Sequence, residues 1–214
     1  MDNFFLFIDT ETTGHDPMRN VDGTLVIPYH EIIDMGAVLS TCNFEILGTF
    51  EQKARPMHPE RSLSSLINNY HERAKRGEWD NAITLQHAIG RLLKFSNSVN
   101  GQKTICCQNI SFDWSFLVIA FALCGITPDD LMSFHNIHYA KLDSRSAAVQ
   151  EVWQPDTLFH PNDYSIRKAT LSRTLDIEDE NWPHAALNGA MKCYEVFRKL
   201  REMRNQRQVI QRKE

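Results

Sequence analysis

The stretch Phe-Phe-Leu-Phe-Ile-Asp-Thr-Glu-Thr-Thr-Gly, residues 4–14, decides the fold of this chain. Its five leading apolar residues predict a central strand that is buried on both faces. Side chains alternate along a strand with a period of two, so Asp9 and Glu11 point to the same side. Two neighbouring carboxylates at the end of a buried strand repel one another, and a divalent cation relieves that repulsion. The stretch therefore predicts a metal site at the end of a central strand.

The composition is that of an ordinary soluble globular protein. Of 214 residues, 42% are hydrophobic and 23% are charged, and this length suits one domain with room for an insertion. No apolar run is long enough for a membrane span and no basic N-terminal region is present, so we expect no membrane anchor or signal peptide. The five cysteines have no Cys-x-x-Cys spacing, which favours buried reduced thiols in a cytoplasmic protein. The sequence also lacks zinc-hydrolase and P-loop motifs.

The charge distribution neither requires nor excludes a nucleic-acid partner. The net charge of −4 is no global nucleic-acid signature, but a metal-dependent nuclease gathers acidic residues at its own site. The C-terminal end is locally basic. We therefore divide the chain into a domain over residues 1–200 and a basic segment, 201–214. This segment is either a solvated helix end or a tail that contacts phosphates.

The order of apolar and polar segments predicts a mixed α/β domain. Strands are expected at residues 31–39 and 45–52, forming an antiparallel meander with the first strand, and again at 104–107 and 139–142. A long loop is expected over 15–29. Helices are expected at 62–76, from a cap at Asp80 through 83–95, at 112–124 up to Gly125, after Asp143, at 165–175 and at 185–204.

Two more residues of chemical interest lie at the starts of predicted helices. Asp113 follows the strand at 104–107, where an aspartate is commonly a helix cap but can also be a ligand. His184 precedes the last long helix, where a histidine caps or packs, or serves as a base. The type of residue alone does not separate these roles.

Four segments carry most of these residues in a fixed order. They are Phe-Ile-Asp-Thr-Glu-Thr-Thr-Gly at 7–14, Asn-Ile-Ser-Phe-Asp-Trp-Ser-Phe-Leu at 109–117, Lys-Leu-Asp-Ser-Arg-Ser-Ala-Ala at 141–148 and His-Ala-Ala-Leu-Asn-Gly-Ala at 184–190. In this order they resemble the DEDDh 3′-to-5′ exonucleases, relatives of the bacterial replicative proofreading subunit, RNase T and oligoribonuclease. The resemblance covers residues 4–197, nearly the whole chain.

The resemblance implies a ribonuclease-H-like fold, with a central mixed sheet of five strands flanked by helices. Three strands would be antiparallel and the rest parallel. It also implies hydrolysis of the 3′ end of single-stranded DNA or RNA, which releases nucleoside monophosphates. Relatives often dimerise, so a homodimer stays open.

The resemblance also assigns roles to single residues. Asp9 would bridge two Mg²⁺ or Mn²⁺ ions, Glu11 would help to hold the first, and Asp113 would support them. Two such ions, roughly 3.5–4 Å apart, stabilise the attacking and leaving oxygens of a phosphoryl displacement. His184 would deprotonate the attacking water. Substrate contacts are expected from Thr10, Thr12, Thr13, Asn109 and Phe112, although threonines and phenylalanines at strand and helix ends are commonly structural.

One position departs from the family pattern. The third motif of the family ends in His-x-Ala-x-x-Asp-Ala, and its Asp is a metal ligand, but this chain has Gly189 there. The neighbouring Asn188 offers a neutral carbonyl oxygen, which is a poorer ligand than a carboxylate. Other acidic residues offer substitutes, unless they form a solvated loop or a helix cap: Asp143, Glu178, Asp179 and Glu180.

The departure leaves two hypotheses. In the first, the protein is a working exonuclease whose metal site is completed by Asn188, water or another carboxylate, and restoring aspartate at position 189 raises its activity. In the second, the protein is weakened or inactive and binds nucleic-acid ends or a protein partner. The presence of Asp9, Glu11, Asp113 and His184 favours the first hypothesis.

Overall fold

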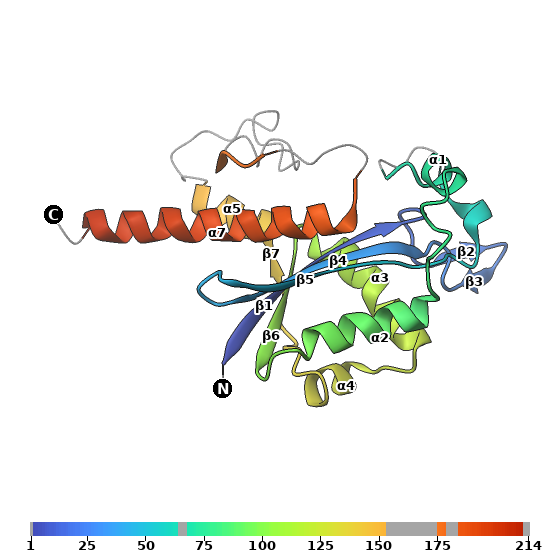
Figure 1. Cartoon of the computed structure of the whole chain (residues 1–214), viewed down its shortest axis with the longest axis horizontal. Helices are drawn as coiled ribbons and strands as arrows, with labels where there is room; N and C mark the ends of the chain where they lie inside the picture. Colours follow the sequence, from blue (N-terminus) through green and yellow to red (C-terminus); the bar gives the residue numbers. More distant parts are fainter. Residues whose placement is uncertain (1, 64–67, 153–174, 179–183, 212–214) are drawn as a thin grey trace.

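A five-stranded mixed sheet forms the centre of the molecule, as expected (Figure 1). The computed structural model describes residues 2–63, 68–152, 175–178 and 184–211. The strands lie in the order β5-β4-β1-β6-β7. β1 pairs antiparallel with β4 and parallel with β6, β5 pairs antiparallel with β4, and β7 pairs parallel with β6. Their bounds are β1 Asn3–Thr12, β4 Ile32–Thr41, β5 Ile46–Lys53, β6 Gln102–Cys107 and β7 Leu142–Asp143.

Helices cover both faces of the sheet, with α7 on one face and α2 and α3 on the other (Figure 1). The alternation along β1 explains this division. Leu6 and Ile8 pack in the cluster that contains α2 and α3, whereas Phe7 packs against α7, where its ring lies 5.5 Å from that of Tyr194. The helices are η1 Pro59–Arg61, α1 Tyr70–Lys75, α2 Leu85–Ser96, α3 Ile110–Leu123, α4 Pro128–Ser133, α5 Ser144–Val152 and α7 Ala186–Gln211.

The segment 15–29 is not a plain loop as predicted, because it contains a small β-hairpin. β2, Arg19–Val21, pairs antiparallel with β3, Thr24–Val26. The two residues between the strands, Asp22 and Gly23, have positive φ angles of 49° and 81°. A two-residue hairpin turn of this kind favours Asp-Gly. The sequence therefore contained this signal, and the prediction overlooked it.

The helix predicted at 62–76 is wrong at residues 62, 63, 68 and 69, which are not helical. α1 begins at Tyr70, and Asn69 before it is left-handed, with φ of 51°; residues 64–67 lie outside the described ranges. The N-cap of α2 is Thr84, whose hydroxyl accepts a hydrogen bond from the His87 backbone, and not Asp80.

Most of the remaining boundaries are close to the predictions, but the strand predicted at 139–142 shares only Leu142 with β7, and α4 was not predicted. α3 ends next to Gly125, which has a positive φ of 72°, and α5 begins directly after Asp143. The helix predicted at 185–204 is α7, which continues to Gln211, so the boundary placed at residue 200 falls inside a helix. Of the helix predicted at 165–175, only the last residue lies inside the described ranges.

All five cysteines are free, and burial raises the pKa of the Cys107 and Cys193 thiols. Cys106 is buried as well, but Cys42 is exposed, so the predicted burial is wrong for that residue. None of the helices within the described ranges has the length and apolar content that crossing a bilayer requires.

Candidate active site

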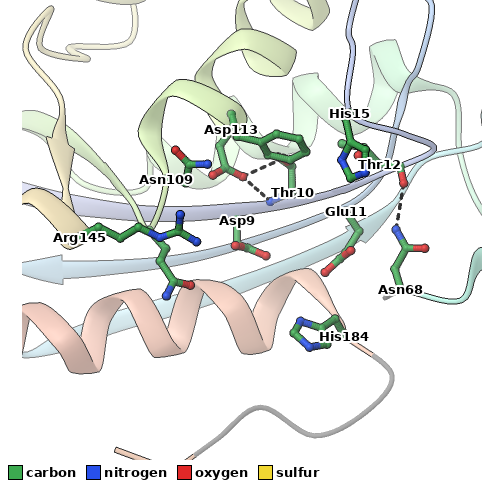
Figure 2. A pocket seen from close by; sticks show the side chains of 12 residues that line it. Asp9, Thr10, Glu11, Thr12, His15, Asn68, Asn109, Asp113, Arg145 and His184 are labelled. Carbon is green, nitrogen blue, oxygen red and sulfur yellow. Dashed lines mark hydrogen bonds between the residues drawn. The ribbon is translucent and has the colours of Figure 1, made fainter. Parts of the chain in front are cut away.

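A pocket of about 210 Å³ opens where β1 and β6 end (Figure 2). Because the two strands are parallel, their carboxyl ends meet at one edge of the sheet, where sites of α/β proteins commonly lie. The pocket brings together all four residues predicted to do chemistry and four of the five predicted substrate contacts. Its lining residues are Asp9, Thr10, Glu11, Thr12, His15, Asn68, Gln108, Asn109, Phe112, Asp113, Arg145 and His184.

β1 sends its two carboxylates to the face that α7 covers. Asp9 and Glu11 have the same parity as Phe7, which packs against α7. Between Glu11 and Thr12 the register with β4 shifts by a bulge. Bulges of this kind turn a strand away from its neighbour and are common beside active sites. The bulge ends the regular pairing of β1 at the pocket.

Asp113 is fastened to β1 from the opposite side. One of its oxygens, Oδ1, accepts hydrogen bonds from the Thr10 backbone amide at 2.9 Å and from the Thr10 hydroxyl at 2.8 Å (Figure 2). Asp113 lies in the first turn of α3, but the N-cap of that helix is Asn109, so the alternative role of a cap does not apply. The two bonds fix the start of α3 beside the end of β1.

Two glycines let α7 approach the sheet at this point. A Cβ atom at Gly36, which pairs with Asp9 across the sheet, would lie 2.1 Å from the backbone nitrogen of Leu187. A Cβ atom at Gly189 would lie 2.2 Å from Oδ2 of Asp9. Neither distance is sterically allowed, so the backbone of α7 lies directly on β4 and the carboxylate of Asp9 fills the space beside Gly189.

This contact changes the interpretation of Gly189. The sequence suggested that aspartate at this position would restore a missing ligand, but any side chain there must first displace Asp9. Asn188, the predicted substitute ligand, is exposed and does not line the pocket. The structure therefore does not bring Asn188 to the carboxylates.

The other acidic substitutes do not reach the pocket either. Asp143 is a cap: its Oδ1 accepts from the Ser146 amide at 2.7 Å and its Oδ2 accepts from the Ile110 amide at 2.9 Å. It thus satisfies the N-termini of α5 and α3 together. Glu178 is exposed and is not a lining residue. Asp179 and Glu180 lie outside the described residues.

The donor chemistry of the pocket fits a hard cation. Carboxylate oxygens are the donors that Mg²⁺ and Mn²⁺ take, and Mg²⁺ commonly uses one or two carboxylates together with water and substrate phosphates. Asp9 and Glu11 supply such a pair. Within the described part of the chain, however, no group of three or more His, Cys, Asp and Glu residues is placed to hold an ion. The pair fits one ion, whereas the four-carboxylate set for two ions is not formed by these residues.

His184 is held at the start of α7 through its backbone. The buried Arg73 donates to the His184 carbonyl at 2.9 Å, to the Asn68 carbonyl at 3.2 Å and to Glu78 at 2.9 Å. Figure 2 shows the imidazole of His184 below Glu11, next to the start of α7. Arg73 thus joins α1 to the segment that carries the predicted base.

Most of the predicted threonine contacts go to the protein itself. The Thr10 hydroxyl donates to Asp113, and the Thr12 hydroxyl donates to the Gly14 carbonyl at 2.6 Å. The Thr13 hydroxyl accepts from the Glu31 amide at 2.8 Å, and Thr13 is buried and lies outside the pocket. The hydroxyls of these threonines therefore have structural roles, which the sequence had offered as the alternative to substrate contacts.

Sequence reasoning missed several residues in and beside the pocket. Arg145 lies inside the segment 141–148 that resembles the family, but no role was expected for it. His15, Asn68 and Gln108 also line the pocket; the Asn68 side-chain amide donates to the Thr12 carbonyl at 2.9 Å (Figure 2). Arg145 lies inside a motif segment, and His15 and Gln108 directly adjoin one, which is a signal that could have found them; Asn68 has no such neighbour.

Asp34 is a further residue that no motif marked. It pairs with Glu11 across the sheet, so the two side chains leave the sheet on the same face. Asp34 is fully buried, and burial raises its pKa to about 6, against the opposing effect of Lys53. It is not a lining residue of the pocket.

The fold matches solved structures of exonucleases. The zinc-bound form of the E. coli exonuclease I complex with single-stranded DNA matches with a TM-score of 0.67 over 94% of this chain. The nuclease domain of 3′hExo, a DEDDh family member bound to rAMP, matches with a TM-score of 0.64 over 95% of this chain. The fold is that of the DEDDh exonucleases. The ribonuclease-H-like sheet predicted from the sequence is therefore confirmed.

The likeness of this exonuclease fold to its neighbours lies in structure far more than in sequence. The identities are 18% to exonuclease I and 16% to the 3′hExo domain. This chain spans 41% of the exonuclease I chain and 93% of the 3′hExo domain. A 3′-exonuclease that recognises the 3′ end of a histone mRNA stem-loop also matches, with a TM-score of 0.63, 16% identity, and coverage of 95% of this chain and 64% of that one. No family model and no curated protein matches the sequence.

Proposed function

We propose that the protein is a 3′-to-5′ exonuclease that acts on single-stranded nucleic acid with the help of a divalent cation. One observation carries the proposal: a single pocket at the end of β1 is lined by Asp9, Glu11, Asp113 and His184. Neighbouring structures of the same fold support it, because they are exonucleases and one of them is a complex with single-stranded DNA. The substrate is DNA, RNA or both.

The residues of the pocket divide the work. Asp9 and Glu11 hold the cation, which supplies charge stabilisation to the phosphate under attack. His184 accepts the proton of the attacking water, a role in which histidine is the most common side chain. Phe112 is partly buried in the pocket wall and offers a ring for the terminal base. Asp113 keeps β1 and α3 together through Thr10.

A second candidate function follows from Gly189. A chain that lacks the fourth carboxylate binds nucleic-acid ends in the same pocket without cutting them. The contact between Gly189 and Asp9 favours this candidate, since the space for the usual ligand is filled. The presence of a histidine at the entrance of the pocket favours the enzyme, because binding alone does not require a base.

Shortening of labelled oligonucleotides tests the proposal. Single-stranded DNA and RNA with a 5′ label are incubated with the full chain in Mg²⁺, in Mn²⁺ and in EDTA. We expect a ladder of products that shorten from the 3′ end only when a divalent cation is present. Asp9→Asn should reduce the rate by at least about 10- to 100-fold, since loss of even an outer partner of a metal has that effect.

Two further variants separate catalysis from binding. His184→Gln should lower the turnover rate by roughly 100-fold or more, yet leave Mn²⁺ binding intact. The exposed Asp129→Asn, on α4, is the matched control and should behave as the wild type. Shortening at the wild-type rate in EDTA or in Asp9→Asn rules out the proposed metal-dependent enzyme. Metal-dependent binding without shortening supports the second candidate.

A further inference from the structure

Arg145 places a cation among the carboxylates of the pocket. It lies in the first turn of α5 and is a lining residue together with Asp9, Glu11 and Asp113. Figure 2 shows its side chain extending into the pocket toward Asp9. Its Nε atom is buried, and no hydrogen-bond partner for that atom is found among the described residues. A guanidinium with an unused donor, aimed at a substrate pocket, is suited to an anion.

The start of α5 is held rigidly. Asp143, the residue before the helix, accepts one hydrogen bond from α5 and one from the first residue of α3. β7 pairs with β6 directly before that point, through Cys107 and Asp143. The guanidinium is therefore presented from a fixed helix end, which limits the entropy lost when it contacts a ligand.

The charges of the pocket balance one divalent ion. Four carboxylates, as in the family motif, balance two divalent ions. Among the residues that the structure describes, this pocket is lined by three carboxylates, Asp9, Glu11 and Asp113, and by one guanidinium, and these groups together carry a charge of about −2 when the histidines are neutral. A single divalent ion neutralises that charge. In the absence of a substrate phosphate, a second ion would leave an excess of positive charge next to Arg145.

We propose that Arg145 takes the place of the second cation, so that the protein uses one divalent ion, held by Asp9 and Glu11, and a guanidinium that contacts the phosphate of the terminal nucleotide. The loss of a carboxylate at Gly189 and the presence of Arg145 are then two parts of one change, because one negative charge is removed and one positive charge is added. The identity of the phosphate ligand rests on the proposed function. The exchange of one carboxylate for one guanidinium in the pocket does not depend on the proposed function.

Counting bound Mn²⁺ and measuring binding of AMP test the inference. The full chain is titrated with Mn²⁺ by electron paramagnetic resonance, with and without AMP, and binding of AMP is measured by calorimetry at saturating Mn²⁺. We expect one Mn²⁺ per chain. Arg145→Gln should weaken AMP binding by on the order of 10-fold, as loss of a charged hydrogen bond does. The same variant should bind Mn²⁺ several-fold more tightly, because a repelling charge is gone.

The opposite signs of these two effects exclude a merely structural role, since a damaged pocket would weaken both. Arg145→Lys, which keeps the charge but loses the planar fork, should bind Mn²⁺ as the wild type and AMP at an intermediate level. The exposed Arg91→Gln, on α2, is the control and should change neither. Two Mn²⁺ per wild-type chain, or unchanged AMP binding in Arg145→Gln, overturns the inference. If these bindings are as expected but oligonucleotides are not shortened, the proposed enzyme fails and the charge exchange stands.

Discussion

Single residues outside the pocket influence its electrostatics. Asp34 is the clearest example: it pairs with Glu11 across the sheet and is fully buried. Both carboxylate oxygens are buried, and the backbone amide of Ala186 at the start of α7 favours the charged form. Burial raises the pKa of Asp34 to about 6 because the charged form loses its hydration. A buried acid so close to Glu11 adds a like charge on the same face of the sheet.

The contribution of Asp34 to the stability of the protein should therefore fall as pH rises from 4 to 8. The ordinary pKa of Asp34 is 3.8, so between that value and about 6 the folded state binds a proton that the unfolded state has released. The stability is complete below pH 4 and is lost as pH rises through 6. The total is on the order of 3 kcal/mol, of which about half lies between pH 5 and 8.

Asp34→Asn removes this dependence. Relative to the wild type, its free energy of unfolding in urea should rise by about 1–2 kcal/mol on going from pH 5 to pH 8. The exposed Asp129→Asn serves as the control at both pH values. An equal difference between Asp34→Asn and the wild type at the two pH values contradicts the prediction.

At the residue level, the sequence predicted the residues that have a motif and missed those that depend on register. Asp9, Glu11, Asp113 and His184 all line one pocket, as expected. Asp34 was missed because its place beside Glu11 follows from the pairing of two strands, which no local pattern reveals. For Asp143 the sequence offered the role of a helix cap, which the structure shows, because an aspartate directly before a helix commonly caps it.

At the level of elements, α7 packs closely on the sheet because two contact positions, Gly36 and Gly189, are glycines without side chains. Its backbone lies on Gly36 of β4, and Asp9 of β1 lies on Gly189 of α7. The first turn of a helix seldom comes so near to a strand, because a Cβ atom on either element would prevent it. The positions of His184 and Asp9 therefore depend on these two glycines.

Replacement of Gly36 should disturb this contact. Gly36→Ala puts a methyl group into the backbone of α7 and should lower the free energy of unfolding by about 1–3 kcal/mol or more. The control is Gly90→Ala on the exposed side of α2, where no atom lies within 4 Å of the new Cβ. That change should raise the free energy of unfolding by up to about 1 kcal/mol, because alanine favours a helix. Equal effects in urea unfolding would falsify the close packing of α7.

The strands β1, β4, β5 and β6 lie within three residues of their predicted bounds, whereas β7 shares only Leu142 with the strand predicted at 139–142, and β2 and β3 were not predicted. The helix predicted at 62–76 failed at residues 68 and 69 for a physical reason. Asn69 adopts a left-handed conformation, and Tyr70 packs its ring 4.9 Å from that of Trp79. The turn at residues 68 and 69 brings Asn68 to the pocket, where its side-chain amide donates to the Thr12 carbonyl. Periodicity does not distinguish such a turn from a helix.

At the level of the whole molecule, the pocket joins parts that are distant in the chain. Thr10 bonds to Asp113 across 103 positions, and Arg73 bonds to the His184 carbonyl across 111 positions. The sequence predicted the sheet and its mixed pairing, because short connections favour antiparallel strands and long ones favour parallel strands. It did not predict the distribution of charge in the pocket, which needs all of these long connections at once.

The amide of Thr10 should be among the most protected in the protein. It is buried and donates to Asp113, which belongs to a helix packed on the central sheet. Its hydrogen exchange should therefore follow global unfolding, with the same free energy as urea unfolding. The Arg19 amide in the small exposed hairpin is the comparison and should exchange much faster. Faster exchange of Thr10 than of the β4 core would contradict this view.

The long contact between Thr10 and Asp113 also has a consequence for synthesis. When the first strand leaves the ribosome, the residue that holds its end in place has yet to be made, and so have Arg145, His184 and Gly189. The ends of such a loop meet only after a substantial entropic cost has been overcome. A growing chain thus displays Asp9 and Glu11 without the rest of the pocket. Any activity of this protein therefore begins only after the start of α7 has been translated.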